Sequence, residues 1–182
     1  MSGVHIQSMI DLGACHPYIG NDTYIFYDRG YKIINVEPHP DNFKLLKKTR
    51  KKDINLDAAI VTNDITEVDF EINKEARLSK VSSKITGYKV KTITIQQLLE
   101  YIDTGENFTL KIDIEGSDYL VLEKFLTYEK KAVIVQIETF DGLRGLSNSN
   151  FDSLMNQHDY LLVSKTPLNS FYFLKSYWPF EV

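Results

Sequence analysis

The sequence predicts an α/β protein with a mostly parallel sheet that is finished by an antiparallel hairpin near the C-terminus. Two observations lead to this prediction. Strand-like and helix-like segments alternate from one end of the chain to the other, which is typical of parallel α/β sheets. Residues 9–14 read as a buried strand that enters a glycine turn, and residues 33–37 read as a second buried strand that ends in a carboxylate. Because 182 residues suffice for one domain with a full core, we expect residues 1–182 to form a single domain.

The first half of the chain supplies the first three strands and two helices. Residues 22–29 are expected to form a helix that ends at Gly30, because glycine is common just past a helix end. Pro40 and Asp41 favour the start of a second helix at 40–52, and residues 54–61 read as the third strand. The basic residues of the second helix are interpreted as a solvated face; they are Lys44, Lys47, Lys48, Arg50, Lys51 and Lys52.

The second half continues the alternation and closes it with the hairpin. Apolar residues at 95, 98, 99 and 102 have helical spacing. The strand at 132–139 is apolar on both faces except at Gln136, as expected for a central parallel strand. Residues 73–89 are polar and are expected to form a surface loop near the site. The other expected elements are a strand at 108–114, helices at 117–126 and 151–157, and hairpin strands at 160–164 and 171–175 joined by a turn at 166–169.

Composition excludes several classes of protein. The net charge of -4 gives no general attraction to nucleic acid, and apolar runs such as residues 132–135 are too short to span a membrane. The first eight residues show no secretory signal. The single cysteine, Cys15, excludes an internal disulfide and agrees with a reducing cytoplasm. We therefore expect a cytoplasmic protein with no nucleic-acid partner and no membrane span.

The first strand, its turn and the acid of the second strand together predict a nucleoside site. Asp11 would fix the turn and hydrogen-bond the amino-acid part of a ligand, Gly13 would leave room for it, and Glu37 would accept the ribose hydroxyls. Residues 13–18 lack the glycines that a pyrophosphate needs, so S-adenosylmethionine is the expected cofactor. The alternatives are a common Asp-x-Gly turn and a surface acid that precedes a helix.

A third strand-end position could complete this site. Asp57 and Ala58 are assigned to the end of the third strand, where an acid can accept a hydrogen bond from the adenine amino group. A solvated aspartate at a strand end is an equally good interpretation of Asp57.

The second polar block is Asp113-Ile-Glu-Gly-Ser117, which follows a buried strand. Alternate residues of a strand share a face, so Asp113 and Glu115 are expected to point the same way if the strand extends that far. Two neighbouring carboxylates raise the pKa of one of them, which suits a general base. Glu138, at the end of the next strand, would add a third carboxylate at the same rim. The alternative is a turn in which only Gly116 and the helix cap Ser117 matter.

Three weaker candidates remain in these segments. His16 is a candidate substrate contact or a plain turn residue beside Pro17, and Cys15 is better explained as a small turn residue than as a nucleophile. The four histidines have no metal-ligand spacing. A divalent metal at Asp113, Glu115 and Asp118 is conceivable but weakly supported, so no metal is expected.

The motifs in this order resemble those of the FkbM family of S-adenosylmethionine-dependent methyltransferases. The resemblance runs from about Ser8 to Thr139, and its most distinctive element is Ile-Asp-x-Glu-Gly. The motifs that carry it are Asp11-Leu-Gly-Ala-Cys-His-Pro-Tyr18, Asn21-Asp-Thr23, Gly30, Asn35-Val-Glu-Pro38, Asp53-Ile-Asn-Leu56, Thr92, Lys111-Ile-Asp-Ile-Glu-Gly116 and Ile137-Glu-Thr139.

The resemblance implies a single-domain class I methyltransferase with a Rossmann-like sheet that acts on hydroxyl groups of sugars, glycans or small metabolites. By position, Asp11, Gly13 and Ala14 would line the methionine end of the cofactor, and Glu37 would bind its ribose. The rim between cofactor and acceptor would be formed by Asp113, Glu115 and Gly116. Cys15 stands where the family more often has asparagine. Only about eight residues precede the first strand, so we expect a minimal form, a truncated form or a domain completed by a partner.

The expected reaction is attack of an acceptor oxygen on the cofactor's methyl group, assisted by a base by ~10²–10⁴-fold. The candidates for the base are Asp113 and Glu115, followed by His16. A nicotinamide dehydrogenase is disfavoured by the missing Gly-x-Gly-x-x-Gly, and a nucleic-acid methyltransferase by the missing Asn-Pro-Pro-Tyr-like motif. The alternative from another class is a degenerate, non-catalytic module that binds a nucleoside or a protein partner. The acceptor is expected to be chosen by residues 73–89 and 140–150. The aromatic tail at 171–180 is expected to pack on the core, with a place in the acceptor pocket or a homodimer contact as the alternatives.

Overall fold

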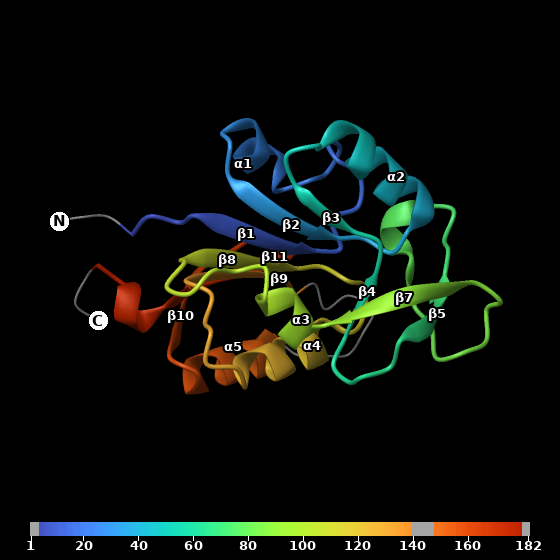
Figure 1. Ribbon diagram of the computed structural model, residues 1–182. Coiled ribbons are helices and arrows are strands. Elements are labelled where there is room, and N and C mark those ends of the chain that lie inside the picture. Colours follow the sequence, from blue (N-terminus) through green and yellow to red (C-terminus); the bar gives the residue numbers. More distant parts are fainter. Residues whose placement is uncertain (1–3, 140–147, 180–182) are drawn as a thin grey trace.

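The main sheet has seven strands in the order β10-β11-β9-β8-β1-β2-β3. The computed structural model describes residues 4–139 and 148–179. The five strands from β3 to β9 pair in parallel, and β11 and β10 complete the sheet as an antiparallel hairpin, which confirms the predicted fold class (Figure 1). The strands are β1 (Ser8–Leu12), β2 (Lys32–Val36), β3 (Ile54–Leu56), β8 (Phe108–Ile112), β9 (Ile134–Glu138), β10 (Tyr160–Lys165) and β11 (Asn169–Leu174).

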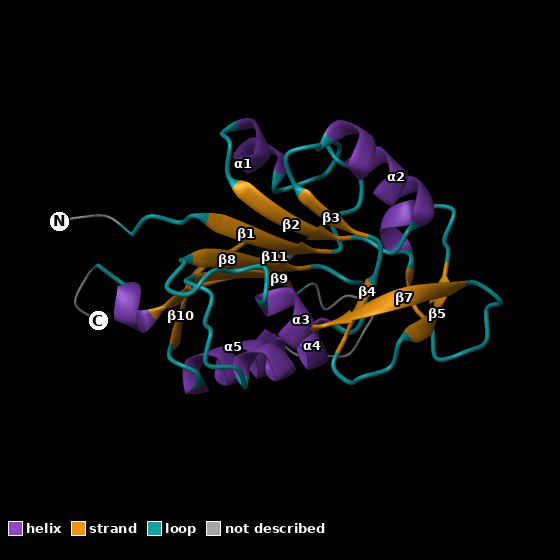
Figure 2. Cartoon of the chain, in the orientation of Figure 1, coloured by secondary structure: helices purple, strands orange, loops and turns teal. Residues whose placement is uncertain are grey.

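Helices cover both faces of this sheet, as Figure 2 shows. On one face lie α1 (Tyr24–Asp28) and α2 (Pro40–Thr49), and on the other lie α3 (Ile95–Leu99), α4 (Asp118–Leu126) and α5 (Asn148–Gln157). A capping box, in which Thr94 and Gln97 bond each other's backbone N–H, starts α3. None of the helices in the described part of the chain has the length and apolarity that crossing a membrane requires.

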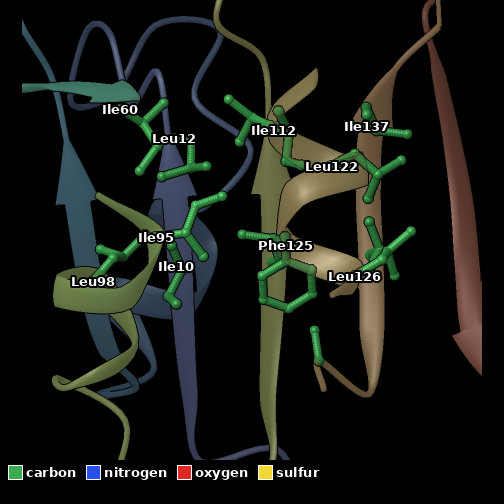
Figure 3. Close-up of a cluster of buried hydrophobic side chains, with 14 of the residues drawn as sticks. Ile10, Leu12, Ile60, Ile95, Leu98, Ile112, Leu122, Phe125, Leu126 and Ile137 are labelled. Atoms are coloured by element: carbon green, nitrogen blue, oxygen red, sulfur yellow. The ribbon is translucent and has the colours of Figure 1, made fainter. Parts of the chain in front are cut away.

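The core lies between the main sheet and the helices α3 and α4. Figure 3 shows Ile10 and Leu12 of β1 close to Ile95, while Phe125 of α4 packs over β8. All of these side chains are buried. Since each buried side chain of this size contributes about 1.5–3 kcal/mol relative to an exposed one, this layer fixes the positions of the strand ends that form the site.

A second sheet, which the sequence analysis missed, lies beyond the carboxyl ends of β1, β2 and β8 (Figure 1). It has the order β4-β7-β5-β6. The expected surface loop at 73–89 contributes part of it. Its strands are β4 (Ala59–Val61), β5 (Glu67–Glu71), β6 (Lys80–Val81) and β7 (Lys89–Thr94), with a 3-10 helix η1 (Ala76–Leu78) between β5 and β6, and a further 3-10 helix η2 (Lys175–Tyr177) follows β11.

The prediction of one strand at 54–61 was therefore wrong. The chain leaves the main sheet after Leu56 and re-enters sheet structure at Ala59, where β4 pairs with β7 instead of β2. Asp57 is exposed at this break and Ala58 is buried. These two residues form the connection between the two sheets.

Two further predictions about local structure were wrong. Arg50 does not belong to a solvated face, because its side chain is 0% exposed and its Nε donates to Asp53 Oδ2 at 2.7 Å. The helix ends at Thr49, and Arg50 follows it at the C-cap position. The strand expected at 108–114 ends at Ile112, so the polar residues that follow it form a turn.

Candidate functional site

A cavity lies where the carboxyl ends of the main sheet face the second sheet. The lining residues surround about 550 Å³ of space not filled by atoms, part of which is open solvent. The main sheet contributes the turns after β1, β2 and β8, and the second sheet contributes the opposite wall. The lining residues are Gly13, Cys15, Val36, Glu37, Pro38, Ala59, Ile60, Phe70, Ala76, Arg77, Ser79, Val81, Asp113, Ile114, Glu115 and Ser117.

Gly13 brings two of these turns into contact. Its φ of 78° is in the left-handed region, and a Cβ added to it would lie 1.8 Å from the carbonyl oxygen of Asp113. The sequence analysis expected Gly13 to leave room for a ligand, whereas the structure shows that it leaves room for the backbone after β8. Any larger residue would separate the two turns.

Glu37 is 5% exposed and has two backbone donors. Its Oε2 accepts from the N–H of Cys15 at 2.6 Å, and its Oε1 accepts from the N–H of His39 at 2.7 Å. Burial raises the pKa of the carboxyl to about 7, although the two N–H donors oppose this shift. Glu37 thus holds the turn after β1 and, with lone pairs remaining on both oxygens, can still accept hydrogen bonds from a ligand in the cavity.

A buried ion pair lies directly behind the cavity. Lys111 Nζ is 3.1 Å from Asp11 Oδ1 and 3.8 Å from Asp113 Oδ2. Asp11 is 0% exposed and also accepts from the hydroxyl of Thr23 at 2.8 Å. Burial alone would lower the pKa of the Lys111 ammonium, but the charges of Asp11 and Asp113 outweigh it and raise this pKa. The lysine therefore stays charged and connects the core to the cavity wall.

Polar contacts extend from this pair to the turn after β1. Arg50 Nη1 donates to Asn21 Oδ1 and to Thr23 Oγ1, both at 3.0 Å. Asn21 Nδ2 in turn donates to the carbonyl of Ala14 at 2.7 Å. Arg50 thereby supports the turn that forms one side of the cavity.

We expect Lys111→Met to lower the free energy of unfolding by about 3–5 kcal/mol, because it leaves the buried Asp11 carboxylate without its counter-charge. Chemical denaturation at neutral pH measures the change. Lys124→Met, on the exposed face of α4, is the matched control and should have little effect. Adding Asp11→Asn should recover part of the loss; a Lys111→Met protein as stable as the control would contradict the expectation.

Three carboxylates meet at the rim. One oxygen from each of Asp113, Glu115 and Glu138 lies within 4.8 Å of the others. Strand alternation does not produce this arrangement, because β8 ends at Ile112 and Glu115 has a φ of 60°. A non-glycine residue adopts this backbone conformation at a cost of about 1–2 kcal/mol, which is consistent with a functional turn.

Asp118 stabilises this turn. Its Oδ1 accepts from the N–H of Ile114 at 2.9 Å and its Oδ2 from the N–H of Gly116 at 2.8 Å. Ser117 occupies the N-cap position of α4, as expected, but its side chain makes no capping hydrogen bond. Asp118 is therefore engaged with the backbone, and Glu138 takes the third position of the carboxylate group.

The carboxylate group can share a proton or surround a cation. Burial raises the pKa of the Asp113 carboxyl, and the positive charge of Lys111 opposes the rise. An aspartate with a raised pKa that faces a cavity is suited to accept a proton.

The structure brings together four of the nine residues expected to form the site. Gly13, Glu37, Asp113 and Glu115 line the cavity. Asp11 and Ala14 lie behind it in the core, and His16 Nδ1 accepts from the N–H groups of Tyr18 and Ile19. Asp57 and Ala58 line a separate hollow near Lys91 and Tyr101. Position therefore gives no support to ligand contacts by these five: Asp11, Ala14, His16, Asp57 and Ala58.

The sequence analysis missed the apolar and basic residues of the opposite wall. Phe70 and Val81 come from β5 and β6, and Arg77 comes from η1. The alternation in Glu-Val-Asp-Phe-Glu at 67–71 is typical of a half-buried strand and could have revealed β5. No signal in the sequence shows that β6 and η1 return to the cavity.

Comparison with known proteins identifies the relatives of this chain. A family model described as "Methyltransferase FkbM domain" matches residues 11–162. The crystal structure of a methyltransferase FkbM from Methylobacillus flagellatus KT is similar in fold, with a TM-score of 0.56 at 17% sequence identity. The similarity covers 92% of this chain but 43% of that protein, so this chain spans less than half of its length. No curated protein matches the chain.

Proposed function

Because the chain belongs to the FkbM methyltransferase family, we propose that it transfers a methyl group from S-adenosylmethionine to a hydroxyl group of a sugar, a glycan or a small metabolite. The observation that carries the proposal is the cavity in which Glu37 at the end of β2 faces the same space as Asp113 and Glu115 after β8. Such a cavity offers a hydroxyl-binding acid and a candidate base in one place.

The cavity residues fit the chemical groups of this cofactor. Val36, Ile60, Phe70 and Val81 provide apolar walls for a base ring, and Glu37 can accept from both ribose hydroxyls. The acids after β8 match the positive charge of a sulfonium. The strand order, with an antiparallel hairpin at one edge, supports a class I methyltransferase sheet.

The cofactor, when bound, supplies an electrophilic methyl group. The chain's own contribution is to hold the acceptor beside it and to take the proton from the acceptor hydroxyl. Asp113 is the first candidate for this base, because it faces the cavity and its pKa is raised by burial. Glu115, within 4.8 Å of it, is the second. The turn that presents both acids is fixed by Asp118, which keeps their orientation when an acceptor enters.

Calorimetric titration with S-adenosylhomocysteine, with NAD as a control ligand, tests the proposal. We expect one molecule of S-adenosylhomocysteine to bind per chain and NAD not to bind, because the turn after β1 lacks a glycine-rich phosphate site. Binding would justify an acceptor screen that starts with sugars and glycans. A folded protein that binds neither ligand would contradict the proposal and favour a non-catalytic module.

A further inference from the structure

The charges on the cavity wall are distributed unevenly. Among the described residues that line it, Arg77 is the one cation, whereas Glu37, Asp113 and Glu115 are acids. Lys111 cannot serve the cavity, because its side chain is buried between Asp11 and Asp113. A ligand that carries a negative group would meet acids on the main-sheet side and a single positive partner on the opposite wall.

Arg77 lines the same cavity as Cys15, in the turn after β1, and Glu115, at the rim. It is carried by η1, and its side chain is 75% exposed. The hydrogen bond and the charge of Glu75 raise the pKa of Arg77.

We propose that Arg77 binds the carboxylate of the methionine part of S-adenosylmethionine. This inference rests on the proposed function and assigns one residue to one chemical group of the cofactor. The methionine part carries a carboxylate together with an ammonium and the sulfonium. The acids of the main sheet complement the two cationic groups but repel the carboxylate, and the guanidinium on the opposite wall carries the charge that complements it.

In the structure Arg77 already binds a carboxylate, that of Glu75. Its Nη2 and Nε donate to one carboxylate oxygen of Glu75, at 2.8 and 3.2 Å. Both side chains are exposed, and such surface pairs contribute little to stability. A ligand carboxylate can therefore replace Glu75, with the planar guanidinium providing two parallel donors.

The test compares two ligands that differ in the amino-acid part. S-adenosylhomocysteine has the carboxylate, whereas 5′-methylthioadenosine has the same nucleoside and a thioether but no amino acid. We expect Arg77→Ala to weaken S-adenosylhomocysteine binding by roughly 10-fold and to leave 5′-methylthioadenosine binding unchanged. Arg77→Lys should fall between, because it keeps the charge but loses the fork. Arg29→Ala, at an exposed arginine that does not line the cavity, is the matched control.

The calorimetric measurements test the assignment of Arg77 to the ligand carboxylate separately from the proposed function. Equal losses for both ligands, or no loss for S-adenosylhomocysteine, would overturn the assignment of Arg77 while leaving the proposed function intact. A Glu75→Ala protein should bind S-adenosylhomocysteine at least as well as the wild type; a loss as large as that of Arg77→Ala would show that the pair shapes η1 rather than binding the ligand. A wild-type protein that binds neither nucleoside would overturn the proposed function as well.

Discussion

Replacing Glu37 with alanine is expected to weaken S-adenosylhomocysteine binding by ~100-fold or more. Two ribose hydroxyls that donate to one carboxylate form two charge-assisted hydrogen bonds, each worth about 1.5–3 kcal/mol, and the sum corresponds to at least two decades in Kd. The variant also removes the acceptor for the N–H groups of Cys15 and His39. Calorimetric titration measures the loss, and Glu123→Ala on the exposed face of α4 should bind like the wild type.

The pH dependence of ligand affinity distinguishes the contact of Glu37 with the ligand from its role in supporting the turn after β1. In the free protein the pKa of Glu37 is raised to about 7, above its unfolded value, so its contribution to stability is present below pH 4.5 and is lost as the pH rises through 7. Hydroxyl donors favour the charged form, so affinity for S-adenosylhomocysteine should rise from pH 6 to pH 8. Glu37→Gln should remove this rise; a rise of equal size in that variant would exclude Glu37 as its source.

The second large effect is expected at the base. Asp113→Asn or Glu115→Gln should lower turnover by ~10²–10⁴-fold while S-adenosylhomocysteine binding stays within a few-fold of the wild type. The amide keeps the size of the side chain but cannot take a proton. Single-turnover measurements with saturating cofactor and an acceptor found in the screen would show the loss.

A control variant and a variant of the third carboxylate help to identify which acid is the base. Asp64→Asn, at an exposed aspartate that does not line the cavity, should turn over normally. Glu138→Gln should have a smaller effect than either cavity acid, because Glu138 belongs to the carboxylate group but does not line the cavity. Near-normal turnover in Asp113→Asn would remove Asp113 from the role and leave Glu115 as the candidate.

The main sheet could be predicted from the sequence because its signals are local. Buried runs such as residues 9–12 and 33–36, a proline at the start of α2 and apolar residues at helical spacing each determine one element without reference to the rest of the chain. The second sheet was missed because its strands are short and β4 continues directly from a segment that reads as one strand. Its existence depends on pairing between β4 and β7, which are separated by more than 25 residues, and no local pattern records such pairing.

The residues of the candidate site also divide into those that local sequence signals reveal and those that they do not. Glu37 and Asp113 could be identified because both follow buried parallel strands, whose carboxyl ends lie at one edge. Asp11 was assigned to the ligand because it precedes a glycine turn, yet Lys111 from the neighbouring strand takes its carboxylate. Arg50 was assigned to solvent because lysines surround it in the sequence. In both cases an ion-pair partner that the local sequence does not reveal determines that the charged side chain is buried.

The two walls of the cavity belong to two separate hydrogen-bonded sheets. No backbone ladder fixes the spacing between β2 and β4 in the described structure, because β4 pairs with β7 and β2 with β1 and β3. Ile60 of β4 and Ile93 of β7 instead belong to the same buried cluster as Ile10 and Ile34 of the main sheet. Side-chain packing therefore sets the distance between the two walls, and the width of the cavity depends on how these apolar residues fit together.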